Sequence, residues 1–497
     1  MTGPSTTLYC VDDLEGVYDR PTQVGRLAGL LRQTPEDAVV VGAGDDTALG
    51  TLAVLVESGL DPTTYVDDVA DGIDDATADS DDAVDSTDDA TVESREPAAD
   101  VNFPERGRGV AEPFFEVVAH DAETLGNHDL DLGASWARDW ADRVPPTYCC
   151  GNLHVDGERP FRAHTTVTAG DALVGITGVT HPDTTEIAVG IEATVSDPVE
   201  TARTELDRLR SQGVDYTVVL SHCGEDDWRL ARETTADAVV GGHVHEQVTT
   251  VVDDTALVRA GGPERVPSVE LSPGQSPEVA VHRVDDAPLH EPTRETYRAY
   301  RDALAVDTPI ASVSEPMRRT QTERVGGESR AGNFLADAIT VAADADCGVF
   351  PAGSLRTGPT LSGDITVGDV VSLCPFDDTV RRLQLTGDQL REVLAACTGE
   401  YPSYEGWVHA HVSGLRVRWN DEGDLLSARL DGDPLDSDAT YTVASTGWFV
   451  VTDAYHPADE EHATVTDTSL LDAFLAHARD GGLSVQCEGR IDRTTVE

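Results

Sequence analysis

Several short apolar runs in this chain each end in a turn that is rich in Gly, Asp, Asn or His. Four of them are residues 7–12, 38–41, 216–220 and 236–240. Segments with helical spacing, such as 22–33 and 198–212, lie between them. Runs of this length are typical of strands that are covered on both faces, and their alternation with helices predicts an α/β fold. Since parallel strands place their carboxyl ends at one edge of a sheet, we expect the turns to converge there.

The turns contain side chains that suit divalent transition metals. These candidate ligands are Asp13, Asp45, Asn127, His222, His243 and His245. Carboxylate, amide and imidazole groups form a mixed oxygen and nitrogen set. A pair of ions about 4 Å apart, bridged by one carboxylate, can bind a phosphate and activate a hydroxide. The remaining histidines that match no pattern are expected to be structural: His120, His154, His164 and His181.

The turn at 126–131 combines this metal chemistry with an ionisable ring. His128 follows the candidate ligand Asn127, and Asp131 lies three residues further on. Asp131 is close enough to fix the ring tautomer of His128 or to stabilise its charged form. The turn therefore has the composition of a hydrolytic centre.

The pattern changes twice along the chain. Between 66 and 110 it becomes a run of Asp, Ala, Ser and Thr that has too few apolar residues for a core, and we expect a disordered acidic insertion. Residues 288–310 contain prolines and one helical segment, and we expect a linker helix. The predicted domains are therefore 1–287, with the insertion, and a mixed α/β domain at 311–497.

The charge balance indicates the salt concentration in which the protein works and the kinds of partner it can bind. The chain has 92 acidic and 35 basic residues, a net charge of −57, and every basic residue is Arg. An acidic surface without Lys is typical of adaptation to molar salt, where screening makes the charge tolerable. The alternative, an acidic protein that binds cationic partners, does not explain the missing Lys. Nucleic acid is an unfavourable partner because no basic stripe is present.

No secretory signal or membrane-length apolar run is seen, and the eight cysteines have no disulfide or CxxC spacing. We therefore expect a cytoplasmic protein with free thiols and no membrane partner. The sequence leaves the oligomeric state open.

The order of the motifs resembles that of the calcineurin-type metallophosphoesterases, specifically the 5'-nucleotidase group with its own C-terminal domain, in a haloarchaeal form. The matching stretches are Asp13-Leu14-Glu15, Gly44-Asp45, Gly126-Asn127-His128-Asp129, His222 and Gly242-His243-Val244-His245. The resemblance implies a four-layer β-sandwich flanked by helices, followed by a smaller mixed α/β C-terminal domain.

The resemblance also implies a role for each residue. Asp45 would bridge two divalent ions, with Asp13, Glu15 and His245 completing one site. Asn127, His222 and His243 would complete the other. His128 would contact the phosphate, with Asp131 as its partner. The ions implied are Mn, Zn, Fe or Co.

Glu15 departs from the family, which has His at this position. A carboxylate is a harder ligand than imidazole, so it favours Mn. The alternative is that Glu15 is not a ligand and that one metal site is weak or empty.

The second half resembles the nucleotidase domain that supplies the nucleoside pocket. The matching stretches are 327–333, 353–356 and 374–376. By this resemblance Arg356 contacts the nucleotide, and Phe376 and Trp448 hold the base between two aromatic faces. Phe376 could equally be a core residue, and Arg356 could belong to a surface ion pair.

We therefore expect a hydrolase that releases phosphate from a small-molecule nucleotide, a nucleoside 5'-monophosphate, through a hydroxide activated between two metals. One alternative is a hydrolase of 2',3'-cyclic nucleotides or nucleotide sugars. Another is a nucleotide-binding or regulatory protein whose metal site is impaired through Glu15.

Overall fold

The computed structural model describes residues 3–47, 50–66, 109–182, 184, 193–398 and 407–494. The chain divides into two compact units. Unit 1 comprises Met1–Glu57 and Pro104–Ala299, and unit 2 comprises Ser58–Phe103 and Tyr300–Glu497. The later division falls within 288–310, the segment predicted as a linker helix. The predicted acidic insertion at 66–110 lies outside the described residues, apart from residues 66, 109 and 110.

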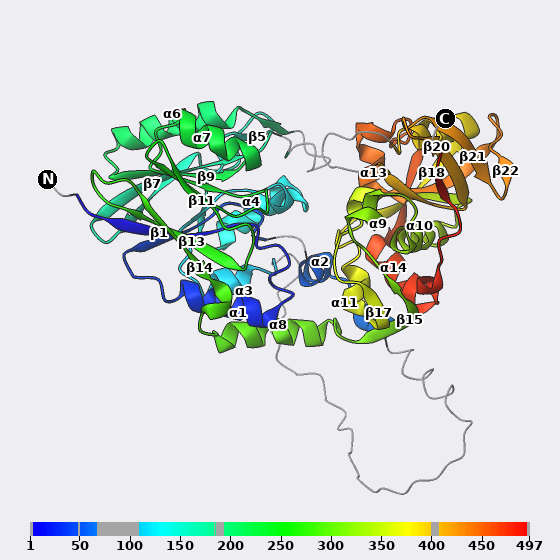
Figure 1. The fold of residues 1–497 in the computed structure, drawn as a ribbon, viewed down its shortest axis with the longest axis horizontal. Coiled ribbons are helices and arrows are strands. Elements are labelled where there is room, and N and C mark those ends of the chain that lie inside the picture. The colour runs from blue at the N-terminus through cyan, green and yellow to red at the C-terminus, as the bar shows by residue number, and fades with distance from the viewer. Residues whose placement is uncertain are drawn as a thin grey trace, which may run out of the picture. The chain divides into compact units, whose positions relative to one another are not determined.

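Unit 1 is built on two six-stranded sheets (Figure 1). In spatial order, the first sheet consists of β14 (Glu278–Arg283), β13 (Arg265–Leu271), β1 (Thr6–Val11), β2 (Ala38–Gly42), β3 (Ala122–Glu123) and β4 (Thr147–Tyr148). The second consists of β11 (Val248–Val252), β12 (Thr255–Arg259), β10 (Ala238–Gly241), β9 (Tyr216–His222), β7 (Ala172–Thr180) and β6 (His164–Ala169). A separate pair is formed by β5 (Leu153–Val155) and β8 (Ala193–Val195).

The central strands of both sheets run parallel. β1 pairs in parallel with β2, and β9 lies between its parallel neighbours β7 and β10. Antiparallel strands such as β14, β11 and β6 occupy edges. Every residue of β9 is buried, because each sheet is covered on both faces. This explains the continuous apolar runs of the sequence.

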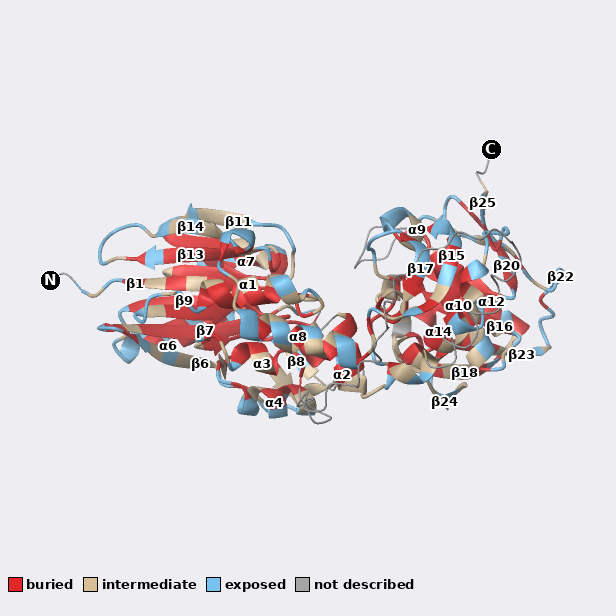
Figure 2. Cartoon of the chain, turned by 90° about the horizontal axis from the view of Figure 1, so that it is seen from below, coloured by how far each residue is buried: buried red, intermediate tan, exposed pale blue. Residues whose placement is uncertain are grey.

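Helices complete four layers. The helices that begin in unit 1 are α1 (Pro21–Leu31), α2 (Thr51–Ser58), α3 (Glu112–Phe115), α4 (Ala134–Arg143), α6 (Pro198–Ser211), α7 (Asp227–Glu233) and α8 (Glu291–Ala303). α6 and α7 pack on the outer face of the second sheet through a cluster that includes Leu206 and Leu230. α1 and α3 lie on the outer side of the first sheet (Figures 1 and 2). The predicted α/β class, with a sandwich flanked by helices, is confirmed.

The main core of unit 1 lies between the two sheets. Leu8 and Val41 from the first sheet meet Ile176, Leu220 and Val240 from the second, and all five are fully buried (Figure 2). This apolar layer holds the sheets face to face, so that the turns at their carboxyl ends are fixed relative to one another.

Unit 2 contains a five-stranded sheet, a four-stranded sheet and a strand pair. In spatial order, the five-stranded sheet consists of β19 (Ala410–Ser413), β16 (Cys347–Pro351), β23 (Thr440–Thr446), β18 (Thr379–Thr386) and β24 (Ala463–Ser469). The four-stranded sheet consists of β22 (Asp433–Pro434), β21 (Leu425–Leu430), β20 (Leu415–Asn420) and β25 (Ile491–Thr494). The pair is β15 (Pro309–Met317) with β17 (Leu361–Thr366). The helices are α9 (Gln321–Val325), α10 (Arg330–Ala342), α11 (Val367–Val371), α12 (Gly387–Ala395), α13 (Gly447–Val451) and α14 (Leu470–Arg479).

An early segment of the chain belongs to unit 2. The short turn Pro62–Tyr65 packs against α14, where the Tyr65 hydroxyl donates a hydrogen bond to Asp472. The Arg479 guanidinium lies over the same ring, 5.8 Å from its centroid. Unit 2 is therefore assembled from two distant stretches of the chain.

Several elements were not expected from the sequence. α4 buries only Ala137 and Trp140, and its remaining residues are mostly polar or charged, so its apolar pattern is weak. β13 contains Pro267, which is opposite Val281 in the ladder with β14 and which argues against a strand in a sequence pattern.

All eight cysteines are free thiols, and all but Cys487 are buried. In the described ranges, none of the helices is both long enough and apolar enough to cross a membrane.

The core between the sheets gives a first prediction. Ile176→Ala should lower the free energy of unfolding by about 2–5 kcal/mol, because it leaves a cavity where the two sheets meet. Val251→Ala, at a side chain that is 38% exposed in the same sheet, should cost less than about 0.5 kcal/mol. Urea unfolding in molar KCl measures both variants. Equal losses would contradict the description of this core.

Candidate functional site

The residues at the carboxyl ends of β1, β2 and β9 converge where the edges of the two sheets of unit 1 meet. Asp13 and Asp45 follow β1 and β2 in the first sheet, whereas His222 ends β9 in the second. The His222 Nε2 and Asp45 Oδ2 atoms are 3.0 Å apart, so the two sheets meet at this point. The convergence follows from the parallel pairing, which places these strand ends at one edge.

Three of the candidate ligands have left-handed backbone conformations. The φ angles are 48° at Asp13, 56° at Asp45 and 74° at His243. Such conformations cost about 1–3 kcal/mol each in residues other than Gly and persist only where the surroundings fix them. Here the Asp13 amide donates to the Gly44 carbonyl at 3.1 Å, and the His243 amide donates to Asp13 Oδ1 at 3.2 Å. The turns therefore hold one another in place.

Gly126 has no side chain, and this allows the Asp45 carboxylate to lie against its backbone. A Cβ at this position would lie 1.9 Å from Asp45 Oδ1. The Asp45 carboxylate thus lies directly against the backbone of the Gly126 turn, and its Oδ1 accepts the His128 amide at 2.8 Å. Any side chain at Gly126 would displace Asp45.

The innermost donor atoms have the character of metal ligands. Asp13, Asp45 and His222 each offer one atom to a group whose members lie within 4.8 Å of one another. His222 Nδ1 donates to the Ala43 carbonyl at 2.8 Å, which directs Nε2 towards the Asp45 carboxylate, 3.0 Å away. Among the described residues, His222 Nε2 and Asp13 Oδ2 are buried atoms without a hydrogen-bond partner. A cation would satisfy both, so these residues fit a divalent metal.

The outer candidate ligands surround this group. Asn127 Oδ1 lies 2.9 Å from His243 Nδ1, a separation that two ligands of one ion can have. His245 Nε2 lies 3.5 Å from Asp13 Oδ1. A second group, formed by Glu15, Asp45 and His128, shares Asp45 with the inner one. The structure thus brings together all nine residues that the sequence assigned to the metal and phosphate site.

His128 is held in its charged form by carboxylates. Its Nδ1 lies 2.9 Å from Asp131 Oδ2, and its Nε2 lies 3.8 Å from Glu15 Oε1. Although burial opposes it, the charge of Asp131, helped by Asp45 and Glu15, raises the pKa of His128 to about 9. In contrast, burial and the neighbouring His222 lower the pKa of His243 to about 4, so its ring is neutral and available as a ligand.

Two buried carboxylates that the sequence assigned to no role support the turns. Asp12 accepts hydrogen bonds from the amides of Ala260, Gly261 and Gly262. Asp129 Oδ2 accepts from the amides of Gly126 and Asp45, at 2.8 and 3.0 Å. The sequence signal for both is adjacency, since each is next to, or two residues from, a candidate ligand.

His181, which we expected to be structural, also lies at the site. Its ring stacks on that of His243, with centroids 5.5 Å apart and planes at 12°. It follows β7 directly, so the rule that selected the other strand-end histidines could have found it.

In unit 2 the three residues predicted to bind the nucleotide are all half-buried. The Arg356 guanidinium lies 5.5 Å from the centroid of the Phe376 ring. Trp448 is on α13, and its amide donates to Asp378 Oδ2 at 2.9 Å. Asp378 is two residues after Phe376, so one carboxylate links the segments that carry the two aromatic rings.

The comparisons with known proteins concern the C-terminal domain and the fold. Residues 309–454 match the family model described as 5'-nucleotidase, C-terminal domain. Over 99% of its length, and of the other chain's, the structure is similar to a 5'-nucleotidase precursor from Thermus thermophilus, with a TM-score of 0.70 and 21% identity. That likeness establishes a shared two-domain fold.

Two curated relatives carry the names of hydrolases. The chain is 24% identical over 431 residues to the trifunctional nucleotide phosphoesterase YfkN of Bacillus subtilis, covering 70% of this chain and 29% of YfkN. It is 24% identical over 393 residues to an apyrase of Tabanus yao, covering 67% and 71%. The chain thus spans less than a third of the first of these relatives. It is a relative of hydrolases that act on ester bonds.

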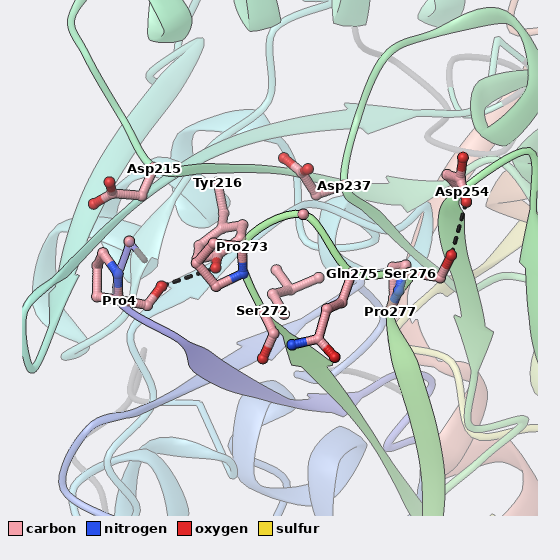
Figure 3. A pocket seen from close by; sticks show the side chains of 13 residues that line it. Pro4, Asp215, Tyr216, Asp237, Asp254, Ser272, Pro273, Gln275, Ser276 and Pro277 are labelled. Carbon is pink, nitrogen blue, oxygen red and sulfur yellow. Dashed lines mark hydrogen bonds between the residues drawn. The ribbon is translucent and has the colours of Figure 1, made fainter. Parts of the chain in front are cut away.

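A pocket elsewhere in unit 1 is not part of this site. It has a volume of about 590 Å³ and is lined by Pro4, Tyr216, Asp237 and neighbouring residues (Figure 3). Tyr216 begins β9 and His222 ends it, so the pocket lies at the opposite end of the strand, about 20 Å from the candidate ligands.

Glu15 gives the second prediction. If its carboxylate is a ligand, Glu15→Ala should lower the metal content by about one ion per chain, because one site loses a donor. Glu15→His should retain both ions and shift the preference from Mn²⁺ towards Zn²⁺. Metal analysis after dialysis in molar KCl measures both variants. Two ions retained by Glu15→Ala at full affinity would exclude Glu15 as a ligand.

Proposed function

We propose that this protein is a metal-dependent phosphohydrolase that releases phosphate from nucleoside 5'-monophosphates. The observation that carries the proposal is the position of Asp45, whose carboxylate belongs to both groups of donor atoms and lies beside a protonated His128. The match of residues 309–454 to a nucleotidase domain and the names of the relatives support the substrate class.

The proposed centre would hold two divalent ions. Asp13, Glu15 and His245 are the donors for one, Asn127, His222 and His243 are those for the other, and Asp45 is shared. When bound, the ions would supply Lewis-acid polarisation of a phosphoryl oxygen and an acidified attacking water. Glu15 makes Mn²⁺ the favoured ion, because carboxylate oxygen is a harder donor than imidazole.

Apart from the ions, the positive charge proposed to face the phosphate is that of the protonated His128 ring. Asp131, at 2.9 Å, orients the ring and keeps it protonated at neutral pH. A positive N–H donor held in this way can bind a phosphate oxygen and stabilise the negative charge that grows during transfer. Because the backbone of His128 is tied to Asp45, the donor is fixed relative to the metal ligands.

Unit 2 would recognise the nucleoside. A base stacked between Phe376 and Trp448 is held by its face, which every base has, and Arg356 adds a charged donor beside it. Asp378 accepts the amides of Thr379 and Trp448, so it fixes the segment after Phe376 to the start of α13, which reduces the cost of ordering both segments when a base binds.

Two further candidates remain. The word "trifunctional" in the name of YfkN favours a broader phosphoesterase that accepts 2',3'-cyclic nucleotides or nucleotide sugars. The Glu15 departure favours a nucleotide-binding or regulatory protein with one impaired metal site.

We also propose that the protein works in molar salt and in the cytoplasm. The net charge of −57 without any Lys supports salt adaptation, because exposed carboxylates repel one another unless they are screened. Seven buried thiols and no disulfide among the eight cysteines fit a reducing compartment. Unfolding temperatures at low and at molar KCl test the first point, and equal stability at both would contradict it.

Phosphate release gives the third prediction. Wild type with Mn²⁺ in molar KCl should release phosphate from AMP or a related nucleoside 5'-monophosphate. His128→Ala should lower kcat by about 10²–10³-fold, because a donor to the developing charge is lost. His154→Ala is the matched control, since this ring lies on β5 and outside the site, and it should retain full activity.

The same assay with 2',3'-cyclic AMP and a nucleotide sugar separates the ester candidates. If folded protein with two bound ions binds nucleotide but releases phosphate from none of these esters, the protein is a nucleotide-binding protein and not a hydrolase.

The aromatic pocket gives the fourth prediction. Phe376→Ala should weaken the binding of AMP by about 1–3 kcal/mol, or roughly 5- to 150-fold in KM, because one stacking face is lost. Ribose 5-phosphate has no base, so its KM should not change. An equal loss for both substrates would assign Phe376 to the core instead.

A further inference from the structure

A second group of metal-binding side chains lies beneath the turns of unit 1 and takes no part in the centre described above. Donor atoms of Asp46, His120 and Glu123 all lie within 4.8 Å of one another. The three residues are 1%, 4% and 0% exposed. They meet because β2 and β3 are neighbours in the first sheet, with Val41 opposite Ala122. Asp46 follows β2, His120 precedes β3, and Glu123 ends it.

Each member of this group has a buried atom without a well-formed hydrogen bond. Within the described ranges, Asp46 Oδ2, Glu123 Oε2 and both ring nitrogens of His120 lack a hydrogen bond of good geometry. The close contacts are inside the group: His120 Nε2 is 3.0 Å from Glu123 Oε2, and the Glu123 carboxyl lies within hydrogen-bond reach of Asp46, so the two acidic groups need a proton or a cation between them. The other two oxygens are used. Asp46 Oδ1 accepts the Leu14 amide at 3.3 Å, and Glu123 Oε1 accepts the amides of Gly44 and Thr124 at 3.1 and 2.9 Å. Burying four such atoms is costly unless a further partner is present.

Further buried carboxylates surround this group. Asp12 and Asp129 lie near enough to act on Asp46, and both are themselves buried carboxylates. The ring of Phe115 closes one side, 5.0 Å from that of His120. On another side Gly42 lies so close that a Cβ there would be 1.8 Å from Glu123 Oε2. Buried carboxylates are stable only when they are paired or bind a cation, so a cation would stabilise this enclosed group.

We propose that Asp46, His120 and Glu123 bind a divalent transition-metal ion at a structural site that is distinct from the two-ion centre. One imidazole nitrogen and two carboxylate oxygens are donors that Mn²⁺ and Zn²⁺ accept. Metal–ligand bonds of about 2.0–2.2 Å place donor atoms roughly 3–4 Å apart, close to the 3.0 Å that separates His120 Nε2 from Glu123 Oε2. The double positive charge balances the two carboxylates.

Such an ion would brace the turn that carries Asp45. Glu123 holds the Gly44 amide through its other oxygen, and Asp46 is the next residue after Asp45. Because the group is enclosed, the ion exchanges only when unit 1 opens. The two-ion centre, in contrast, has outer donors at the surface, such as His245, whose side chain is 55% exposed, so a chelator can reach its ions. The two kinds of site are therefore separable by experiment.

The test is metal retention. Wild type is prepared with Mn²⁺ in molar KCl, dialysed against EDTA without denaturant, checked for folding by circular dichroism, and analysed for Mn. About one ion per chain should remain, and unfolding in EDTA should release it. Asp46→Asn and His120→Leu should retain none. Asp45→Asn, which removes the proposed bridge of the two-ion centre, should lose activity but keep the enclosed ion, so failure of one proposal is distinguishable from failure of the other.

Glu205→Gln is the matched control. Glu205 is an equally buried carboxylate in unit 1 that contacts a histidine, His164, at 2.7 Å, but it belongs to no group of three donors. This variant should keep the ion. Folded wild type that retains no metal, or Asp46→Asn that still retains it, would overturn the proposal. If Asp46→Asn and His120→Leu do not fold, anomalous scattering from crystals of EDTA-treated wild type decides: a Mn peak among the three side chains supports the site, and its absence there overturns it.

Discussion

The candidate centre depends on one contact between the two sheets of unit 1, that of His222 with Asp45. Each residue ends or follows a parallel strand in a different sheet, and the apolar core between the sheets fixes their separation. The hydrogen bond from His222 Nδ1 to Ala43 directs the other ring nitrogen at the Asp45 carboxylate. The packing of the two sheets therefore determines the distance between His222 and Asp45. Other candidate ligands are then positioned by short bonds to these two turns.

Unit 1 concentrates buried carboxylates around this contact. Asp12 and Asp129 are stabilised by backbone amides, which lets them brace the turns without a cationic partner. Asp45 has imidazole neighbours instead, and the charge of His222 holds its pKa below the usual range although burial opposes this. The second oxygens of Asp46 and Glu123 accept no backbone amide, and the one imidazole beside them, that of His120, lies 3.0 Å from Glu123 Oε2 and is shared by both carboxyl groups. Asp12 and Asp129, which accept backbone amides, are therefore suited to support the turns. Asp46 and Glu123, which do not have amides at their second oxygens, are suited to bind a metal.

The sequence predicted the strand ends well because parallel strands in a covered sheet must be apolar along their whole length. The residues just after those runs, such as Asp13, Asp45 and His243, could therefore be grouped before any geometry was known. The group of Asp46, His120 and Glu123 could not be found in this way. It depends on the register between β2 and β3, and β3 has only two residues, Ala122 and Glu123. His120 alone carries no signal. The helix α4 was missed for a related reason, since its few buried side chains leave little periodicity to detect.

The anchoring of Tyr65 on α14 bears on how the chain is completed during synthesis. Tyr65 and its partner Asp472 are separated by 407 positions, so the ribosome releases the first long before it makes the second. The larger part of unit 1, Pro104–Ala299, emerges in between, and domains generally fold as units from the N-terminal side. The turn Pro62–Tyr65 would then leave the ribosome early and have no docking surface until α14 has been synthesised. Maturation of unit 2 is thereby tied to the end of translation.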